Sequence, residues 1–317
     1  MKITVGLAGC KQYPLYAASG ADEVFCGYVP ESWTRRYGLS LPLNRRETRF
    51  FPVQLGGKNE LRILKYMRQD LGVPVTLTFN ALCYRPEQYE QIACIMEDCA
   101  EEGFDTFIVA DPGLMVHLCG TPLHGKIRIH VSGEFGAMNR YGMEEVRRLG
   151  ADRVIFHRRT GIGNMASMIR ADREAHPDAP LETEVFVMNE MCHFTGAYCN
   201  SLHCDEMAHA CHLPWRLAPL ERGAVPPPAA SPGRDENRYG TPGFSGCGLC
   251  ALPRLERAGV KVLKVVGRGA DPEDMVRDIT AVRKALTILN EQAEDGFENA
   301  MKEACFPDGC GGNCYYP

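Results

Sequence analysis

Short runs rich in β-branched residues alternate with longer amphipathic stretches through most of this chain of 317 residues. Most of the runs are too apolar to be half-exposed strands, which favours a buried parallel sheet. Such alternation predicts a sheet that is open or closed into a barrel, and the length permits one large barrel or two domains. We expect strands at the start of the chain and at 75–79, 106–110, 127–131, 153–156, 184–187 and 260–266, and helices at 59–71, 87–103, 142–149, 163–176 and 272–289.

A segment rich in proline and glycine interrupts this pattern at residues 217–243. Proline removes a backbone donor and glycine is costly to order, so we expect a long flexible loop here. Long loops without structure of their own are often lids.

Composition excludes some functional classes. The chain is 45% hydrophobic and 24% charged with a net charge of −5, which is typical of a globular protein and disfavours nucleic-acid binding through phosphate contacts. No run approaches the 18 or so apolar residues of a membrane span, and we expect a cytoplasmic protein. In that compartment the 15 cysteines are thiols or metal ligands more often than disulfides.

Cysteines gather between residues 192 and 250, where six of the 15 lie together with four of the nine histidines. Converging thiolates suit either tetrahedral zinc or an iron–sulfur cubane. Only Cys247 and Cys250 have the C-x2-C form that zinc sites usually carry twice, so an iron–sulfur cluster is favoured over zinc. Buried apolar thiols or disulfides are the structural alternative. Cys192 follows the end of a predicted strand, where barrel active sites gather.

Several short motifs occur in a characteristic order. The motifs are Gly20–Gly27, Asn80, Gly103–Asp105 with Asp111–Gly113, His130–Ser132 with Asn139, Gly150–Val154, Glu184–Val187 leading into Cys192-x6-Cys199, then Cys211 and Cys250, and Leu263–Lys264 with Gly267–Arg268. Each motif alone is weak, but the combination is specific. With these motifs the chain resembles the peptidase U32 family over roughly residues 3–285.

The resemblance implies a TIM-barrel-like fold that holds a 4Fe-4S cluster, with a cysteine-rich insertion and the long loop within a domain of residues 1–290, followed by a cysteine-rich tail at 291–317. It implies Cys192, Cys199, Cys211 and Cys250 as ligands. The implied activity is oxygen-independent hydroxylation with prephenate as oxygen donor. Short members resemble the paired anaerobic ubiquinone-hydroxylation proteins, which implies a heterodimer with a related family member.

The chain departs from the family pattern near the expected site. Met188 and Asn189 replace a His-Gly pair, Arg159 replaces a glutamate, Val266 replaces an acidic residue, and the stretch between Cys199 and Cys211 is short. These changes affect the substrate and acid–base positions and spare the thiolates. Cys204 or Cys247 also compete for a ligand position.

Polar residues at predicted strand ends are candidates for catalysis and substrate binding. Glu134 and His193 are candidate proton carriers. The alternatives for the whole set are helix caps, turns, solvated loops and structural ion pairs. The candidate substrate contacts are Arg45, Asp111, Asn139, Lys264 and Arg268.

The tail carries Cys305, Cys310 and Cys314 in a glycine-rich segment that could wrap a metal. We expect a second metal or cluster here, completed by Cys204 or Cys247, or else a flexible tail with reactive thiols.

Three functions remain. The favoured one is an iron–sulfur enzyme that transfers a hydroxyl group to a small aromatic or quinone-like molecule. The second is an RNA-hydroxylating enzyme of the same family, which the acidic net charge disfavours. The third is a metal-stabilised protein without redox chemistry or a peptidase, although the sequence contains no His-Glu-x-x-His motif.

Overall fold

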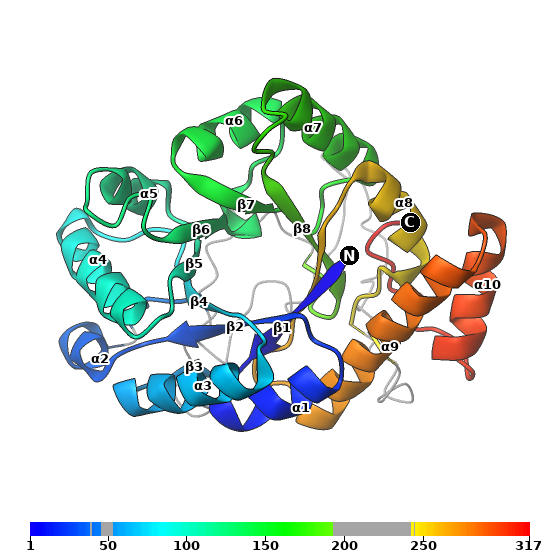
Figure 1. Ribbon diagram of the computed structural model, residues 1–317, viewed down its shortest axis with the longest axis horizontal. Coiled ribbons are helices and arrows are strands. Elements are labelled where there is room, and N and C mark those ends of the chain that lie inside the picture. The colour runs from blue at the N-terminus through cyan, green and yellow to red at the C-terminus, as the bar shows by residue number, and fades with distance from the viewer. Residues whose placement is uncertain (39, 46–52, 193–241, 244) are drawn as a thin grey trace, which may run out of the picture.

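The strands form a closed parallel barrel with helices around it (Figure 1). This computed structural model describes residues 1–38, 40–45, 53–192, 242–243 and 245–317. Within these residues the strands are β1 (Lys2–Leu7), β2 (Glu23–Tyr28), β3 (Gln54–Leu55), β4 (Val75–Phe79), β5 (Thr106–Val109), β6 (Arg128–Val131), β7 (Ala151–Ile155), β8 (Glu182–Met188) and β9 (Val262–Val265).

Strand β1 closes the barrel because it pairs in parallel with both β2 and β9. Val5 lies opposite Val24 on one side and opposite Val265 on the other. The short β3 pairs with the end of β2, so the barrel itself has the eight strands β1, β2 and β4 to β9. The expected barrel is therefore complete, and the seven predicted strands are confirmed. Strand β2, which we did not predict as a strand, is the eighth.

The helices follow the strands in the order expected for repeated βα units. The five predicted helices are present. Pro86, Pro112 and Pro272 each stand at the first position of a helix, where the missing N–H costs nothing. The described helices are α1 (Tyr13–Ala18), α2 (Glu31–Tyr37), α3 (Lys58–Leu71), α4 (Pro86–Glu101), α5 (Pro112–Cys119), α6 (Arg140–Arg148), α7 (Ile162–Ala175), α8 (Leu252–Ala258), α9 (Pro272–Glu291) and α10 (Glu294–Cys305).

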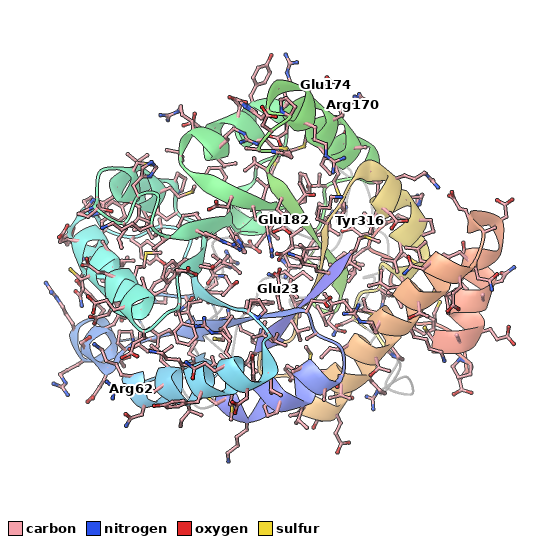
Figure 2. All side chains as sticks on the ribbon, viewed as in Figure 1. Glu23, Arg62, Arg170, Glu174, Glu182 and Tyr316 are labelled. Atoms are coloured by element: carbon pink, nitrogen blue, oxygen red, sulfur yellow. The ribbon has the colours of Figure 1, made fainter. Side chains whose placement is uncertain are left out.

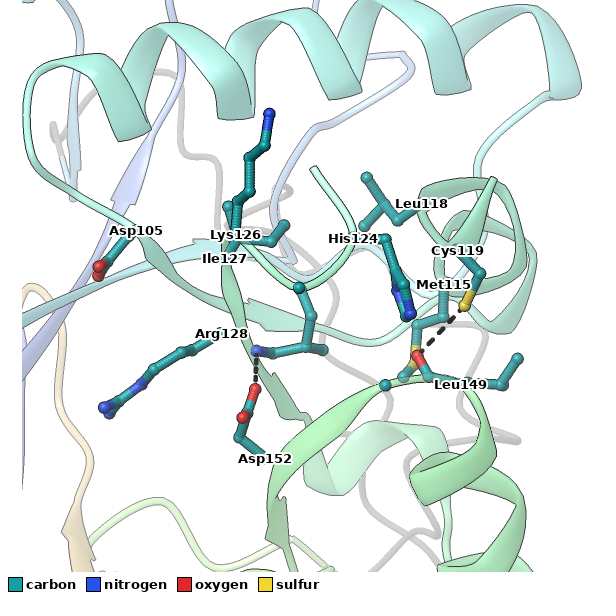
Figure 3. Close-up of a pocket in the computed structure, with 13 residues that line it drawn as sticks. Asp105, Met115, Leu118, Cys119, His124, Lys126, Ile127, Arg128, Leu149 and Asp152 are labelled. Carbon is teal, nitrogen blue, oxygen red and sulfur yellow. Dashed lines mark hydrogen bonds between the residues drawn. The ribbon is translucent and has the colours of Figure 1, made fainter. Parts of the chain in front are cut away.

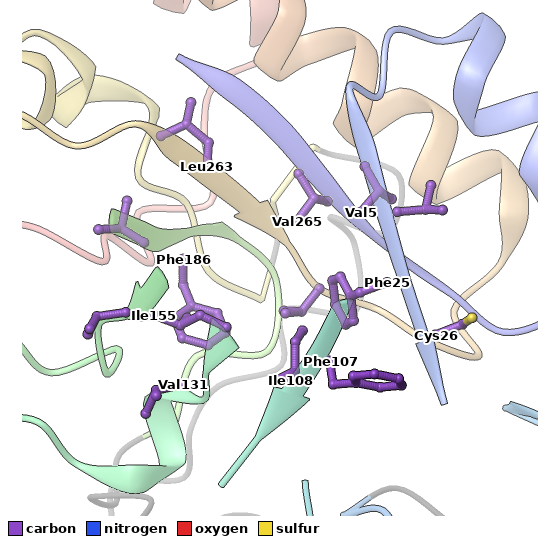
Figure 4. Close-up of a cluster of buried hydrophobic side chains, with 14 of the residues drawn as sticks. Val5, Phe25, Cys26, Phe107, Ile108, Val131, Ile155, Phe186, Leu263 and Val265 are labelled. Atoms are coloured by element: carbon purple, nitrogen blue, oxygen red, sulfur yellow. The ribbon is translucent and has the colours of Figure 1, made fainter. Parts of the chain in front are cut away.

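Apolar side chains of the strands make the core (Figure 4). Val5, Leu263 and Val265 come from neighbouring strands and are fully buried. Phe25 and Phe186 are also buried, and they belong to strands that carry charged residues two positions away. Because side chains two positions apart lie on the same face of a strand, these two rings share the barrel interior with the charged residues, and the intervening side chains point to the helix-facing side.

The barrel interior contains a network of buried charges (Figure 2). The Arg153 guanidinium, 1% exposed, donates to Glu23 at 2.7 Å, to Glu184 at 2.8 Å and to Glu182 at 2.6 Å. Lys264 donates to Glu184 at 2.6 Å. Buried charges need such partners, since an unpaired ion would lose its hydration without compensation.

The network lies toward the amino ends of the strands, since Glu23 is the first residue of β2 and Glu182 is the first residue of β8. Burial raises the pKa of Glu23, but hydrogen bonds and charge from Arg153 and Lys2 outweigh it and lower the pKa. For Lys264, burial outweighs Glu184 and lowers the pKa. The network holds these strands together at a place where other barrels use apolar layers.

A pocket of about 390 Å³ opens at the amino ends of β5, β6 and β7 (Figure 3). The carboxylate of Asp152 accepts from the Ile129 amide at 2.8 Å on one side, and the Cys119 thiol donates to the Leu149 carbonyl at 3.6 Å on the other. In parallel barrels this end serves stability, and catalysis takes place at the opposite end.

The last residues of the chain return to the barrel after α10. Helix α10 packs on α9, and Cys247 forms bridge pairs with Met188 at the end of β8 and with Cys314. Tyr316 donates from its hydroxyl to the Phe186 carbonyl at 2.8 Å. In the described part of the chain, no helix is long and apolar enough to cross a membrane.

Candidate functional site

Glu134 connects two arginines at the carboxyl end of the barrel. It lies on the short helix η2 (Gly133–Phe135), directly after β6. Its carboxylate is 3.1 Å from Nη1 of Arg158, which follows β7, and 3.5 Å from Nη1 of Arg45. The three side chains are only 9–12% exposed. A predicted proton carrier and a predicted substrate contact, Glu134 and Arg45, are thus brought together.

Arg158 stacks on an aromatic ring. Its guanidinium carbon lies 3.9 Å from the centre of the Phe186 ring, and among the described residues its buried Nε has no hydrogen-bond partner. Burial lowers the pKa of Arg158, but Tyr315, Glu134 and the nearby Cys192 outweigh it and raise the pKa. The guanidinium therefore stays charged, with a donor directed into a mostly buried environment.

His157 precedes Arg158 and is buried at the same end of the barrel. Its Nδ1 accepts from the Arg159 amide at 3.1 Å, so the neutral ring carries its proton on Nε2. Burial lowers the pKa of His157, and the charge of Glu134 only partly opposes this. At neutral pH the ring is neutral and able to take up a proton.

Arg268 follows β9 and crosses the barrel toward β2 and β4. Its Nη1 donates to Gln54 at 3.2 Å and to the Thr78 hydroxyl at 3.1 Å. This approach needs Gly27 in β2, because a Cβ there would lie 1.4 Å from Gln54 Oε1 and 2.9 Å from the Arg268 guanidinium. The predicted residue Arg268 is therefore fixed in the barrel mouth.

A strained bend follows β8 and leads to Cys192. Asn189 and Glu190 have φ values of 65° and 47°, a left-handed conformation that costs most residues about 1–3 kcal/mol. The side-chain amide of Asn189 donates to Asp278, and the Tyr315 hydroxyl donates to the Asn189 carbonyl. Strain that is held by several partners is common at functional sites.

The two predicted thiolate ligands in the described residues lie on segments that contact each other. The amide of Asn189 donates to the Gly246 carbonyl at 2.8 Å, and the amide of Gly248 donates to the Val187 carbonyl at 2.7 Å. Cys192 therefore follows one of these segments and Cys250 follows the other. Both side chains belong to residues that are partly buried. Cys199, Cys211 and His193 lie outside the described residues.

The other predicted substrate contacts have structural partners. Both carboxylate oxygens of Asp111 accept backbone N–H groups, from Gly113 and Tyr84, each at 2.7 Å. Asn139 caps α6 by accepting from the Gly142 amide at 3.0 Å. Lys264 is held by Glu184 inside the barrel. Asp111, Asn139 and Lys264 therefore have structural roles. Arg45, Glu134 and Arg268 are the predicted site residues that lie at the barrel mouth.

Arg158, His157 and Tyr315 belong to the site, and the sequence analysis missed them. The signal for the first two was a basic run directly after a buried strand, at the carboxyl end where barrel chemistry occurs. Tyr315 carries no local signal, because its contacts are with Asn189 and Arg158, far away in the sequence.

The fold and the site define a TIM-barrel-like protein with its polar residues at the carboxyl ends of the strands. A family model described as peptidase family U32 matches residues 10–306. The chain therefore belongs to the peptidase U32 family. None of the curated proteins matches it in sequence.

Solved structures with a similar arrangement include the U32 peptidase Mk0906, at 15% identity with 59% of this chain and 69% of that chain covered and a TM-score of 0.42. Phosphoribosyl anthranilate isomerase is another, at 11% identity, and the match covers 90% of this chain and 99% of that chain with a TM-score of 0.42. Thiamine phosphate pyrophosphorylase from Pyrococcus furiosus has 11% identity, 89% and 94% coverage and a TM-score of 0.42.

Proposed function

We propose that the chain is an iron–sulfur enzyme that transfers a hydroxyl group, without molecular oxygen, to a small aromatic or quinone-like substrate. One observation carries this proposal: the strained bend after β8 leads Cys192 to the neighbourhood of Arg158, which is mostly buried and stacked on Phe186. The thiol that we propose as a ligand, a fixed cation and an aromatic surface thus share the end of the barrel where chemistry takes place. Membership of the family supports the same choice.

The residues present fit a cluster. Cys192 and Cys250 follow segments whose backbones are hydrogen-bonded to each other, and Cys199 and Cys211 lie outside the described residues. We propose these four as the ligands. When bound, a 4Fe-4S cluster would supply electron transfer, or Lewis acidity if one iron had an open position.

The arginines favour a carboxylate-bearing ligand. The Arg158 Nε donor is buried without a hydrogen-bond partner among the described residues, and guanidinium groups bind carboxylates with two parallel hydrogen bonds. Stacking of Arg158 on Phe186 adds a flat apolar surface beside the charge. A ring-bearing dicarboxylate such as prephenate, our proposed oxygen donor, matches this combination of charge and surface.

His157 and Glu134 are placed for proton transfer in this proposal. His157 is neutral at neutral pH because burial lowers its pKa, and its Nδ1 is occupied by the Arg159 amide. A proton would therefore move at Nε2. Glu134 accepts a hydrogen bond from Arg158 and forms an ion pair with Arg45 at 3.5 Å, so its first role is to orient these two arginines. His157 is therefore the better candidate for the proton-transfer step.

We further propose a related family member as partner in a heterodimer. The reaction joins an oxygen donor, an acceptor and an electron-transfer group, and a second chain would supply a further site for one of them. Gel filtration of the chain alone and after co-expression with a related chain tests this part of the proposal.

The central experiment measures iron and acid-labile sulfide after purification without oxygen. We expect about four of each per chain, as for one cubane. Cys192→Ser should abolish iron binding, while Cys83→Ser, at an exposed cysteine on the β4–α4 loop, should retain it. Iron that survives Cys192→Ser contradicts the ligand assignment. Cleavage of peptides by the iron-free protein would instead favour the activity that the family description names.

A further inference from the structure

The C-terminal tail carries a second group of thiols beside the proposed cluster. Cys310 and Cys314 enclose the sequence Gly-Gly-Asn, and Cys247 forms a C-x2-C unit with Cys250. The sequence separates these two units widely. The fold joins them, because Cys247 and Cys314 form a parallel bridge pair.

Backbone hydrogen bonds hold the two units in register. The Cys247 amide donates to the Asn313 carbonyl at 2.8 Å, and the Tyr315 amide donates to the Cys247 carbonyl at 2.8 Å. Cys247 is therefore held between the residues that flank Cys314. Directly paired residues of adjacent strands have their side chains on the same face, so the two thiols lie on one side of this pair.

Cys310 precedes Cys314 in a turn that contains two glycines in the left-handed region. Gly309 and Gly312 have φ values of 90° and 72°, which glycine adopts without strain, and the Cys314 amide donates to the Gly312 carbonyl at 3.1 Å. Burial, together with the charges of Cys250, Cys314 and Cys310, raises the pKa of the Cys247 thiol to about 12. The Cys310 and Cys314 side chains thus lie close enough to Cys247 to act on it electrostatically.

Cys305, which the sequence suggested as a member of this group, points elsewhere. Its thiol donates to the Ala281 carbonyl at 3.6 Å, and the residue is buried between α10 and α9. The predicted group was Cys305, Cys310 and Cys314 completed by Cys204 or Cys247, and the structure favours Cys247 with Cys310 and Cys314 without Cys305.

We propose that Cys247, Cys310 and Cys314 bind one soft divalent cation of the zinc class, separate from the iron–sulfur cluster. Three thiolates with water in the fourth position make a tetrahedral zinc site of ordinary composition. In the described part of the chain no three ligand side chains are already arranged to hold a metal ion. Binding therefore requires the glycine-containing turn between Cys310 and Cys314 to close around the ion.

The site has a structural consequence. Tyr315 and Tyr316 follow Cys314 directly and make the contacts to Asn189 and Phe186 at the barrel mouth. A metal on Cys314 would fix these two tyrosines beside Arg158 and Cys192. The Lys302 ammonium, close enough to Cys250 and Cys310 for their charges to raise its pKa, would balance part of the thiolate charge.

The test uses the full chain with Cys192→Ser, which removes the proposed iron–sulfur cluster. A negative result then concerns the zinc-class site alone and leaves the proposal of the cluster unaffected. Cobalt(II) added to the metal-free protein should bind at about one ion per chain with the thiolate charge-transfer and intense visible bands of a tetrahedral site. Zinc should displace it and release protons, because the thiols must ionise to bind.

Cys310→Ser/Cys314→Ser in the same chain should abolish the cobalt bands, and Cys83→Ser/Cys94→Ser, at two exposed cysteines, should keep them. Zinc should also protect Cys247, Cys310 and Cys314 from alkylation in the chain with an unaltered tail, which mass spectrometry measures without any tail substitution. Absence of cobalt binding, or bands that persist in the tail variant, overturns the proposal.

Discussion

Arg158 and Glu134 form a 3.1 Å ion pair that joins the end of β7 to the end of β6 at the barrel mouth. The pair is mostly buried, so each partner depends on the other for compensation of its lost hydration. The second oxygen of Glu134 faces Arg45. One carboxylate thus orients two guanidinium groups. Substitution of either arginine should therefore weaken ligand binding more than it destabilises the fold.

Arg158→Gln should weaken prephenate binding about ten- to a hundredfold. The lost charge-assisted hydrogen bonds are worth roughly 1.5–3 kcal/mol, and 1.4 kcal/mol corresponds to a factor of ten. Calorimetry with the iron-loaded protein measures the change. Arg159→Gln is the matched control, because its exposed side chain belongs to the next residue. Equal weakening by both substitutions would show that only the general positive charge matters.

Arg153→Met should destabilise the fold by about 3–5 kcal/mol, because it leaves Glu23 and Glu184 buried with too few cations. Urea unfolding of the two proteins measures this difference. Arg148→Met removes the exposed pair with Glu145 and should leave the free energy of unfolding almost unchanged. A similar cost for both variants would mean that water reaches the interior network.

Tyr316→Phe should cost about 1 kcal/mol, because it removes the hydrogen bond from the buried hydroxyl to the Phe186 carbonyl and leaves that acceptor without this donor. The measurement is again the free energy of unfolding in urea. Tyr66→Phe, at a side chain that is 67% exposed on α3, should leave it unchanged. An unchanged stability for Tyr316→Phe would indicate that the tail leaves the barrel in solution.

The strands and most helices were predictable because their signal is local. Val75–Phe79 is a short run of β-branched and apolar residues and forms β4 with the predicted bounds. Strand β2 was not predicted because Glu23 and Gly27 interrupt its apolar pattern. Only the closed barrel explains these two residues, since Glu23 forms an ion pair with Arg153 and Gly27 leaves room for Arg268. Charges inside a barrel contradict the usual assignment of charged residues to the surface.

The candidate site was predictable in part for the same reason. Glu134 and Arg268 stand directly after strands, so their position at the barrel mouth follows from the strand order. The pairing of Cys247 with Cys314 joins segments from distant parts of the sequence, and neither segment has a regular pattern of its own. Such contacts arise from the course of the whole chain, and spacing alone left Cys204 and Cys247 as alternatives and included Cys305, whose thiol points toward Ala281.

Burial of the His130 ring should make the free energy of unfolding decrease in weakly acidic solution. It is 2% exposed, and burial lowers its pKa well below the ordinary value, with the charges of Arg153, Arg128, Lys264 and Lys2 lowering it further. Above about pH 6.5 the ring is neutral in both states and adds no pH dependence. Below that pH the unfolded chain binds a proton that the folded chain does not, so stability decreases as the pH falls, by up to about 1.4 kcal/mol per pH unit.

Urea unfolding between pH 7.5 and about pH 5 measures this slope, above the range where carboxylates such as Glu23 titrate. His130→Asn should remove up to about 1.4 kcal/mol per pH unit from the slope. His157→Asn should reduce the slope as well, since burial also lowers the pKa of His157. An unchanged slope in His130→Asn would mean that the ring takes up its proton in the folded state, which would require the surrounding cations to move away from it.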